Sequence, residues 1–82
     1  MIKHKCNLIK LFGFDGITFG DHVFLSDKGY DNAPLLRHEQ VHCDQYKRYG
    51  FFGFIGKYLV ETMKNGYANN SLEIEARRAE IV

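Results

Sequence analysis

The sequence predicts a single α+β domain, residues 1–82, in which a small antiparallel sheet of about three short strands precedes three helices. Two observations carry this prediction. Residues 7–25 contain short runs rich in Ile, Phe, Val and Leu between turn signals, whereas residues 34–82 place apolar residues at helical spacing. The 82 residues are 45% hydrophobic and 15% aromatic, which indicates one small folded core rather than disorder.

The expected strands lie near residues 7–13, 16–19 and 22–26. Asp15-Gly16 and Gly20-Asp21 separate the apolar runs, and both dipeptides are typical of tight turns between strands. His4 then falls in the N-terminal tail and His22 in the second turn. We therefore expect both to be surface histidines rather than metal ligands.

The expected helices span about residues 34–49, 51–66 and 71–82. Residues 26–33 form a polar loop before the first helix, which Asp31 or Asn32 can cap. Pro34 suits its first turn, and Gly50 can end it.

The second expected helix carries one broad apolar stripe, which is typical of a helix packed on a core. The stripe consists of Phe51, Phe52, Ile55, Tyr58, Leu59, Thr62 and Met63. Gly53 and Gly56 interrupt this helix, and each weakens it by about 1 kcal/mol relative to alanine. We expect the two glycines to allow close packing against the preceding helix.

Charge and cysteine content restrict the possible partners. The net charge is +1, with basic and acidic residues interspersed, so we expect neither nucleic-acid nor membrane binding. Cys6 and Cys43 form no C-x-x-C pair, and no apolar run has signal-peptide length, which favours reduced thiols and a cytoplasmic location. On a helix Cys43 points about 100° away from His42, so we expect a buried thiol rather than a ligand.

The first expected helix contains His38-Glu39-Gln40-Val41-His42, a match to H-E-x-x-H. Residues four apart lie on one helix face, so both imidazoles can bind one Zn²⁺ at about 2.0–2.1 Å. Glu39 follows the first histidine and can take a proton from a water at the metal without binding the metal itself. Gln45 and Tyr49 continue the histidine face.

A zinc hydrolase needs a third protein ligand. The metzincin pattern would place glycine at position 45 and histidine at position 48, whereas the chain has Gln45 and Arg48. The remaining candidates are the carboxylates of the third expected helix, Glu73, Glu75 and Glu80.

The segments HEQVHCDQYKRYGFFGFIGKY and GYANNSLEIEARR resemble the minigluzincins, very small relatives of the thermolysin-type gluzincin metallopeptidases. The resemblance covers roughly residues 16–80. It implies a short sheet, an active-site helix, a backing helix and a "glutamate helix" that supplies the third ligand. It also implies that some members are latent, held inactive by their own chain or by self-association.

Two arguments select different glutamates as this ligand. In gluzincin-like families a small residue stands three positions after the ligand glutamate, and Asp or Asn stands four positions after it. Glu73 has the small residue, Ala76, but Arg77 at the fourth position. Arg77 therefore does not supply the carboxylate that usually hydrogen-bonds to a ligand histidine in these families. Helical phase instead favours Glu75, which shares a face with apolar residues. We predict Glu73, keep Glu75 as the alternative, and place Glu80 last.

Glu73 also has a structural alternative, because Asn70-Ser71-Leu72-Glu73 fits a capping box at the start of the third helix. Tyr67 lies just before that helix and is the candidate for stabilising an oxyanion.

The sequence therefore predicts zinc-dependent hydrolysis of a peptide or protein substrate, with Glu39 as general base and the substrate added as a strand at the sheet edge. A catalytically inactive, zinc-stabilised binding or regulatory module is the alternative. A purely structural domain with a chance motif is the third possibility.

Overall fold

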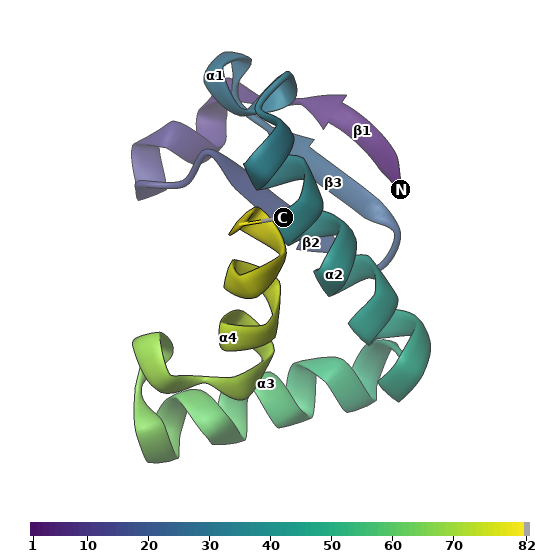
Figure 1. The fold of residues 1–82 in the computed structure, drawn as a ribbon, viewed down its shortest axis with the longest axis vertical. Coiled ribbons are helices and arrows are strands. Elements are labelled where there is room, and N and C mark those ends of the chain that lie inside the picture. Colours follow the sequence, from purple (N-terminus) through teal and green to yellow (C-terminus); the bar gives the residue numbers. More distant parts are fainter. Residues whose placement is uncertain (82) are drawn as a thin grey trace.

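The chain forms a three-stranded sheet followed by helices, of which α2 lies against the sheet and α3 and α4 pack on α2, as the computed structural model of residues 1–81 shows (Figure 1). The α+β class predicted from the sequence is confirmed. The strands are β1 (Ile2–Lys5), β2 (Gly16–Phe19) and β3 (His22–Leu25). The α-helices are α1 (Asp27–Tyr30), α2 (Ala33–Tyr49), α3 (Phe51–Asn65) and α4 (Ser71–Arg78). Three 3₁₀ helices complete the fold: η1 (Asn7–Phe12), η2 (Tyr67–Asn69) and η3 (Ala79–Ile81).

The sheet has the strand order β1-β3-β2 and is mixed. The hairpin β2–β3 is antiparallel, as predicted, and Gly20 turns it with a φ of 65°. β1 runs parallel to β3, with Ile2 opposite His22, so the prediction of an antiparallel sheet is wrong for this pair. The reason is topological: β2 reverses the chain, and β3 reverses it again before it pairs with β1.

The strand predicted near residues 7–13 is wrong, because this segment forms η1, and the strand lies earlier, at β1. Only Ile9 of η1 is buried. The Asn7 side chain exchanges two hydrogen bonds of 3.0 Å with Asp27, which hold the segment against α1 rather than in the sheet. His4 and His22 therefore lie in strands, not in the tail and the turn; His22 is exposed, as expected, and His4 is half-buried.

The helices after the sheet follow the predicted order, with one addition. Asn32 caps α2 by accepting a hydrogen bond from the Leu35 amide at 3.1 Å, and Gly50 ends the helix with a φ of 77°. The predicted polar loop contains the short helix α1, which Ser26 caps. The third predicted helix ends earlier than expected, because α4 passes into η3 after Arg78.

Helix α2 lies at the centre of the packing. Its residue Cys43 is buried with Val23 and Leu25 of β3, in a cluster that joins α2 to the sheet. The second cluster, which consists of Tyr46, Phe54 and Leu72, joins α2 to α3 and α4. The thiol of Cys43 is free and buried, as predicted, and burial raises its pKa to about 11. His42 directly precedes Cys43 of the first cluster, and its ring lies edge-on to Phe54 of the second, with ring centroids 5.9 Å apart.

Much of the apolar stripe on α3 faces outward. Phe54 is the buried residue of this helix, whereas Phe52, Leu59 and Met63 are exposed. An ideal Cβ at Gly56 would meet no atom within 4 Å, and one at Gly53 would meet only the Tyr49 side chain. The expectation of close packing against the preceding helix is therefore wrong for Gly56, whereas Gly53 does lie against Tyr49, the last residue of α2. None of the helices formed by residues 1–81 combines the length and apolar composition that crossing a membrane requires.

Candidate metal centre

The structure brings His38 and His42 of α2 together with Glu73 in the first turn of α4. The Nε2 atoms of both histidines lie 3.1 Å from the same carboxylate oxygen, Oε1 of Glu73. Ligands about 2.0–2.1 Å from a tetrahedral zinc ion are separated by about 3.3 Å. The donor set and its spacing therefore fit a His₂Glu zinc site. These three residues are the ones in the part of the chain described whose ligand atoms gather within 4.8 Å.

Hydrogen bonding sets the charge state of this cluster without metal. Burial opposes ionisation of Glu73, but the hydrogen bonds from His38, His42 and Tyr58 outweigh it and hold the Glu73 pKa well below its usual range. Burial likewise disfavours protonated His38 and His42, yet the nearby Glu73 carboxylate raises the pKa of each above 6.5. Protons therefore compete with a cation for this site near neutral pH.

Each histidine of the cluster has a second partner at its other ring nitrogen. Nδ1 of His42 lies 2.9 Å from the side-chain oxygen of Gln45, one turn further along α2. Nδ1 of His38 lies 2.6 Å from Oε2 of Glu80 in η3. Glu80, which we placed last among the candidate ligands, instead contacts the far side of the His38 ring. The spacing in the sequence could have indicated this contact, because Glu80 follows Glu73 by about two helical turns and so lies on the same helix face.

Glu75 points away from the cluster. It accepts a hydrogen bond of 2.6 Å from the Gln45 amide and pairs with Arg48 at 3.4 Å on the surface. The helical-phase argument that favoured Glu75 fails because α4 turns Leu72, Glu73 and Ala76 inward.

The start of α4 is capped, but not by a reciprocal capping box. The Asn70 side chain accepts a hydrogen bond from the Leu72 amide at 2.9 Å, as a helix cap does. The Ser71 amide donates to Glu61 of α3 at 3.0 Å. Glu73 directs its carboxylate to the histidines instead.

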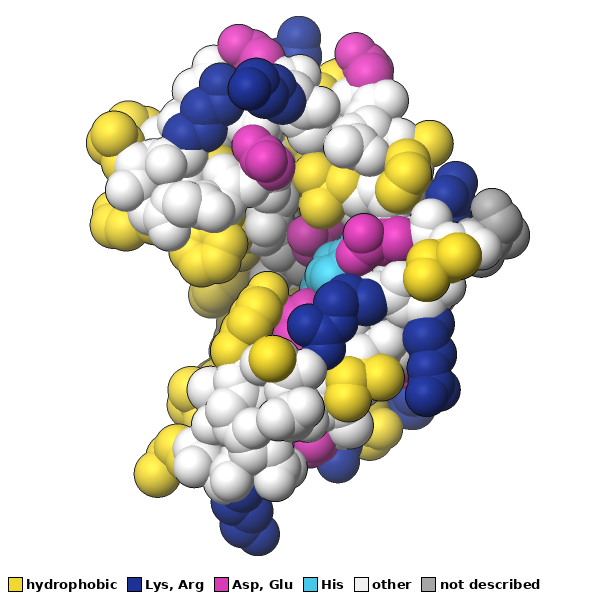
Figure 2. Space-filling model, turned by 60° about the vertical axis from the view of Figure 1, so that its left-hand side comes forward, with side chains coloured by type: hydrophobic (Ala, Val, Ile, Leu, Met, Phe, Trp, Pro, Cys, Tyr) yellow, Lys and Arg dark blue, Asp and Glu magenta, His cyan; other side chains and the backbone are white. Residues whose placement is uncertain are grey.

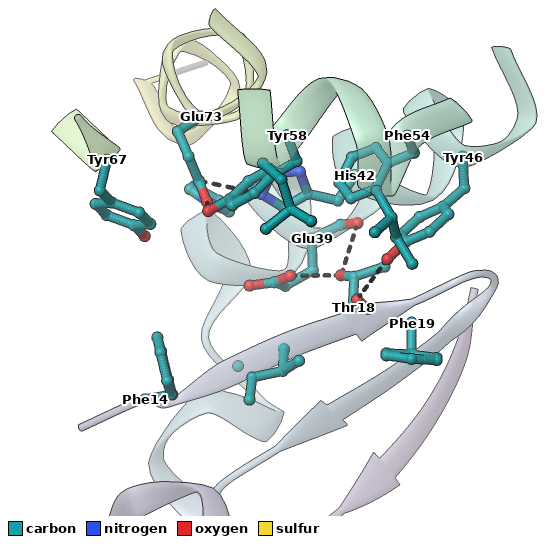
Figure 3. Close-up of a pocket in the computed structure, with 15 residues that line it drawn as sticks. Phe14, Thr18, Phe19, Glu39, His42, Tyr46, Phe54, Tyr58, Tyr67 and Glu73 are labelled. Atoms are coloured by element: carbon teal, nitrogen blue, oxygen red, sulfur yellow. Dashed lines mark hydrogen bonds and ion pairs between the residues drawn. The ribbon is translucent and has the colours of Figure 1, made fainter. Parts of the chain in front are cut away.

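Glu39 is buried beside the cluster and is held by the sheet (Figure 3). The hydroxyl of Thr18 on β2 donates a hydrogen bond of 2.5 Å to Oε2 of Glu39. A Cβ at Gly16 would lie 3.0 Å from Oε1 of Glu39, so glycine at this position leaves that oxygen its space. Glu39 therefore lies beside the His38, His42 and Glu73 cluster. Its Oε2 accepts the hydrogen bond from Thr18, and its Oε1 lies beside Gly16.

Two tyrosines approach Glu73 from the other side. The hydroxyl of Tyr58 on α3 donates a hydrogen bond of 2.5 Å to Oε2, the oxygen that does not face both histidines. Burial and the adjacent Glu73 raise the Tyr58 pKa well above its ordinary value, so the phenol keeps its proton. Tyr67, the predicted oxyanion residue, lies in η2 and lines the same cleft. Sequence analysis assigned Tyr58 to the core stripe and missed its contact with Glu73.

The centre opens into a cleft of about 520 Å³ between β2 and α3. Figure 2 shows a hollow with histidine and acidic side chains at its inner end and hydrophobic side chains on both sides. Beyond the centre the lining is mostly aromatic and aliphatic, and comprises Phe14, Ile17, Phe19, Tyr46, Phe54, Ile55, Leu59 and Tyr67. β2 is an edge strand of the sheet, so its outer edge borders this cleft.

Comparison with known proteins returned no match to this chain among protein-family models, curated proteins or solved structures.

Proposed function

We propose that this domain is a zinc-dependent peptidase in which His38, His42 and Glu73 hold the metal and Glu39 is the general base. The observation that carries the proposal is the position of one Glu73 oxygen, 3.1 Å from both histidine Nε2 atoms, at the inner end of an open cleft. A structural zinc site usually has four protein ligands, whereas three ligands facing a cleft leave a position for substrate. The resemblance to the minigluzincins agrees with this assignment.

Glu39 is placed to transfer protons in the reaction. When bound, zinc supplies Lewis acidity, which polarises a substrate carbonyl and brings the pKa of water towards about 7. Glu39 takes a proton from the attacking water and returns it to the leaving amine. Thr18 holds Oε2 of Glu39 at 2.5 Å, so Oε1 is the oxygen that accepts this proton.

The cleft favours an extended peptide with apolar side chains near the scissile bond. The outer edge of β2 offers backbone groups to which a peptide can add as a further strand. Among the residues that line the cleft, the ionisable groups other than tyrosine are those of the motif and Glu73. Because no lysine or arginine among residues 1–81 lines it, the cleft offers an acidic side chain no cationic partner.

A catalytically inactive, zinc-stabilised binding or regulatory module is the second candidate. It is favoured by the location of the centre, which joins α2 to α4 between two small core clusters. Metal bound there stabilises the fold whether or not a peptide is cleaved. Zinc binding alone therefore does not separate the two functions.

Replacing Glu39 with glutamine separates them. The variant keeps the side-chain volume but cannot accept a proton, so it should bind about one zinc per chain like the parent. Cleavage of a mixed unfolded protein substrate should fall by about 10²–10⁴-fold. Asp44→Asn, which removes an exposed carboxylate from the same helix, is the matched control and should cleave normally.

Three results decide the assignment. Equal cleavage by parent and Glu39→Gln rules out Glu39 as the base. Zinc binding without cleavage of any substrate favours the binding module. Absence of zinc from protein purified without chelator, with no uptake on addition, refutes the metal centre itself.

A further inference from the structure

The last described turn of the chain, η3, reaches back to the first half of α2. Arg37 of α2 donates a hydrogen bond of 2.8 Å from Nε to the Ala79 carbonyl. Its Nη2 donates a second, of 2.9 Å, to the Glu80 carbonyl. Carbonyls at the end of a helix lack partners within that helix, so the guanidinium satisfies two of them at once. Arg37 thereby fixes the backbone that carries Glu80.

From this arrangement we infer that Glu80 is the carboxylate that orients His38 for metal binding, and that Arg37 is the positioning residue that holds Glu80 in place. The inference deepens the proposed metal centre and rests on it. The carboxylate that hydrogen-bonds to the metal-binding histidine would then be Glu80, which stands further from Glu73 than the fourth position after it. Arg77, which occupies that position, instead donates to the Ala68 carbonyl.

The two nitrogens of His38 have separate partners. Nδ1 lies 2.6 Å from Oε2 of Glu80, and Nε2 lies 3.1 Å from Oε1 of Glu73. An ionised carboxylate can only accept at Nδ1, so it keeps a proton on that nitrogen. When His38 gives up its other proton to make way for a cation, the lone pair is therefore on Nε2, the nitrogen that faces Glu73. Charge-assisted hydrogen bonds of this length are stronger than neutral ones. Glu80 thus selects both the tautomer and the ring orientation that binding requires.

The two ligand histidines differ in where their support comes from. His42 is supported by Gln45, on the same helix and one turn away, so its partner forms with α2 itself. His38 is supported by a residue on η3, separated from it by 42 positions in the chain. The affinity of the centre consequently depends on the docking of η3 against α2, which Arg37 maintains.

Zinc affinity, measured by competition with a chromophoric chelator, tests this inference. Losing an outer partner of a ligand histidine typically weakens metal binding about 10- to 100-fold, and we expect this loss for Glu80→Ala. Glu80→Gln, which keeps a neutral acceptor, should lose less. Asp44→Asn removes an exposed carboxylate from α2 that contacts none of the three cluster residues, and this variant should bind zinc as the parent does.

A double-mutant cycle tests the role of Arg37. Arg37→Gln should also weaken zinc binding, and combining it with Glu80→Ala should add little, because Arg37 acts through Glu80. Fully additive losses would overturn this part of the inference. Zinc affinity of Glu80→Ala equal to that of the parent, in a variant with the parent's circular dichroism spectrum, would overturn the inference as a whole.

A readout that needs no metal separates this inference from the proposed function. In isotope-labelled protein the Nδ1 proton of His38 should be protected from solvent exchange in the parent and lost as a resonance in Glu80→Ala. If the parent takes up no zinc but this proton behaves as stated, the proposed function fails and the orienting contact stands. If the parent shows no protected proton, Glu80 does not orient His38.

Discussion

Replacing Glu73 with glutamine should remove the third zinc ligand while keeping the shape of the side chain. Its carboxylate accepts three contacts, two of 3.1 Å to the histidine Nε2 atoms and one of 2.5 Å from Tyr58. Loss of an outer partner costs about 10- to 100-fold in metal affinity, so loss of a charged ligand should exceed about 100-fold, or about 2.7 kcal/mol.

Glu75→Gln is the matched comparison, because it removes the same charge from the same helix. Glu75 pairs with Arg48 at 3.4 Å at the surface and contacts the centre only through the Gln45 amide. An exposed pair of this kind contributes little, so its loss should change zinc affinity by less than about tenfold.

Chelator competition gives both affinities, and circular dichroism of the metal-free proteins shows whether each variant folds. A larger loss for Glu75→Gln than for Glu73→Gln would refute the assignment of Glu73 and restore the helical-phase argument. Loss of the fold in Glu73→Gln with unchanged zinc affinity would show that Glu73 acts on the helix end rather than on the metal.

Two further predictions concern pH and backbone stability. Because the pKa values of His38 and His42 are raised above 6.5 in the metal-free fold, apparent zinc affinity should rise with pH between about pH 5 and 8, and chelator competition across that range measures it. The stability of the metal-free protein should depend on pH in a different way. The two histidines contribute their full stabilisation below pH 6.5 and lose it as the pH rises, whereas Glu73 contributes its full stabilisation above pH 4.5 and loses it as the pH falls. The free energy of unfolding in urea should therefore be highest between pH 4.5 and 6.5. A steady rise in metal-free stability towards pH 8 would contradict this cluster. Gly56→Ala, on the exposed side of α3 with open space at the Cβ, should raise the free energy of unfolding by about 0.5–1 kcal/mol without changing zinc affinity, and a lower melting temperature would contradict it.

The motif helix was predictable because its signals are local. Asn32 and Gly50 mark its ends, and both are read from single residue types with known backbone preferences. The spacing of His38 and His42 places both on one face of any helix, so their convergence needed no tertiary information. The +3 pattern behind Glu73 selected the glutamate that the structure brings to the two histidines.

The N-terminal segment was not predictable in the same way. A short apolar run such as residues 7–12 suits a strand or a helical turn equally well, and its neighbours decide between them. Here Asn7 bonds to Asp27, which follows it by 20 positions, so no local pattern reveals the contact. β1 likewise depends on pairing with the central strand β3.

The partners of the centre, Thr18, Tyr58 and Glu80, were not predicted because each contacts it from an element distant in the sequence. Thr18 on β2 donates a hydrogen bond to Glu39, the proposed general base; Tyr58 on α3 donates one to Glu73, and Glu80 on η3 contacts His38. These three partners come from three different elements outside α2, whereas Gln45, the partner of His42, lies on α2 itself. An isolated α2 therefore retains both histidines and the base but none of these three partners. If the proposed centre is correct, the sheet, α3 and the C-terminal turn each orient a different one of its groups, so the whole of this small domain contributes to the site.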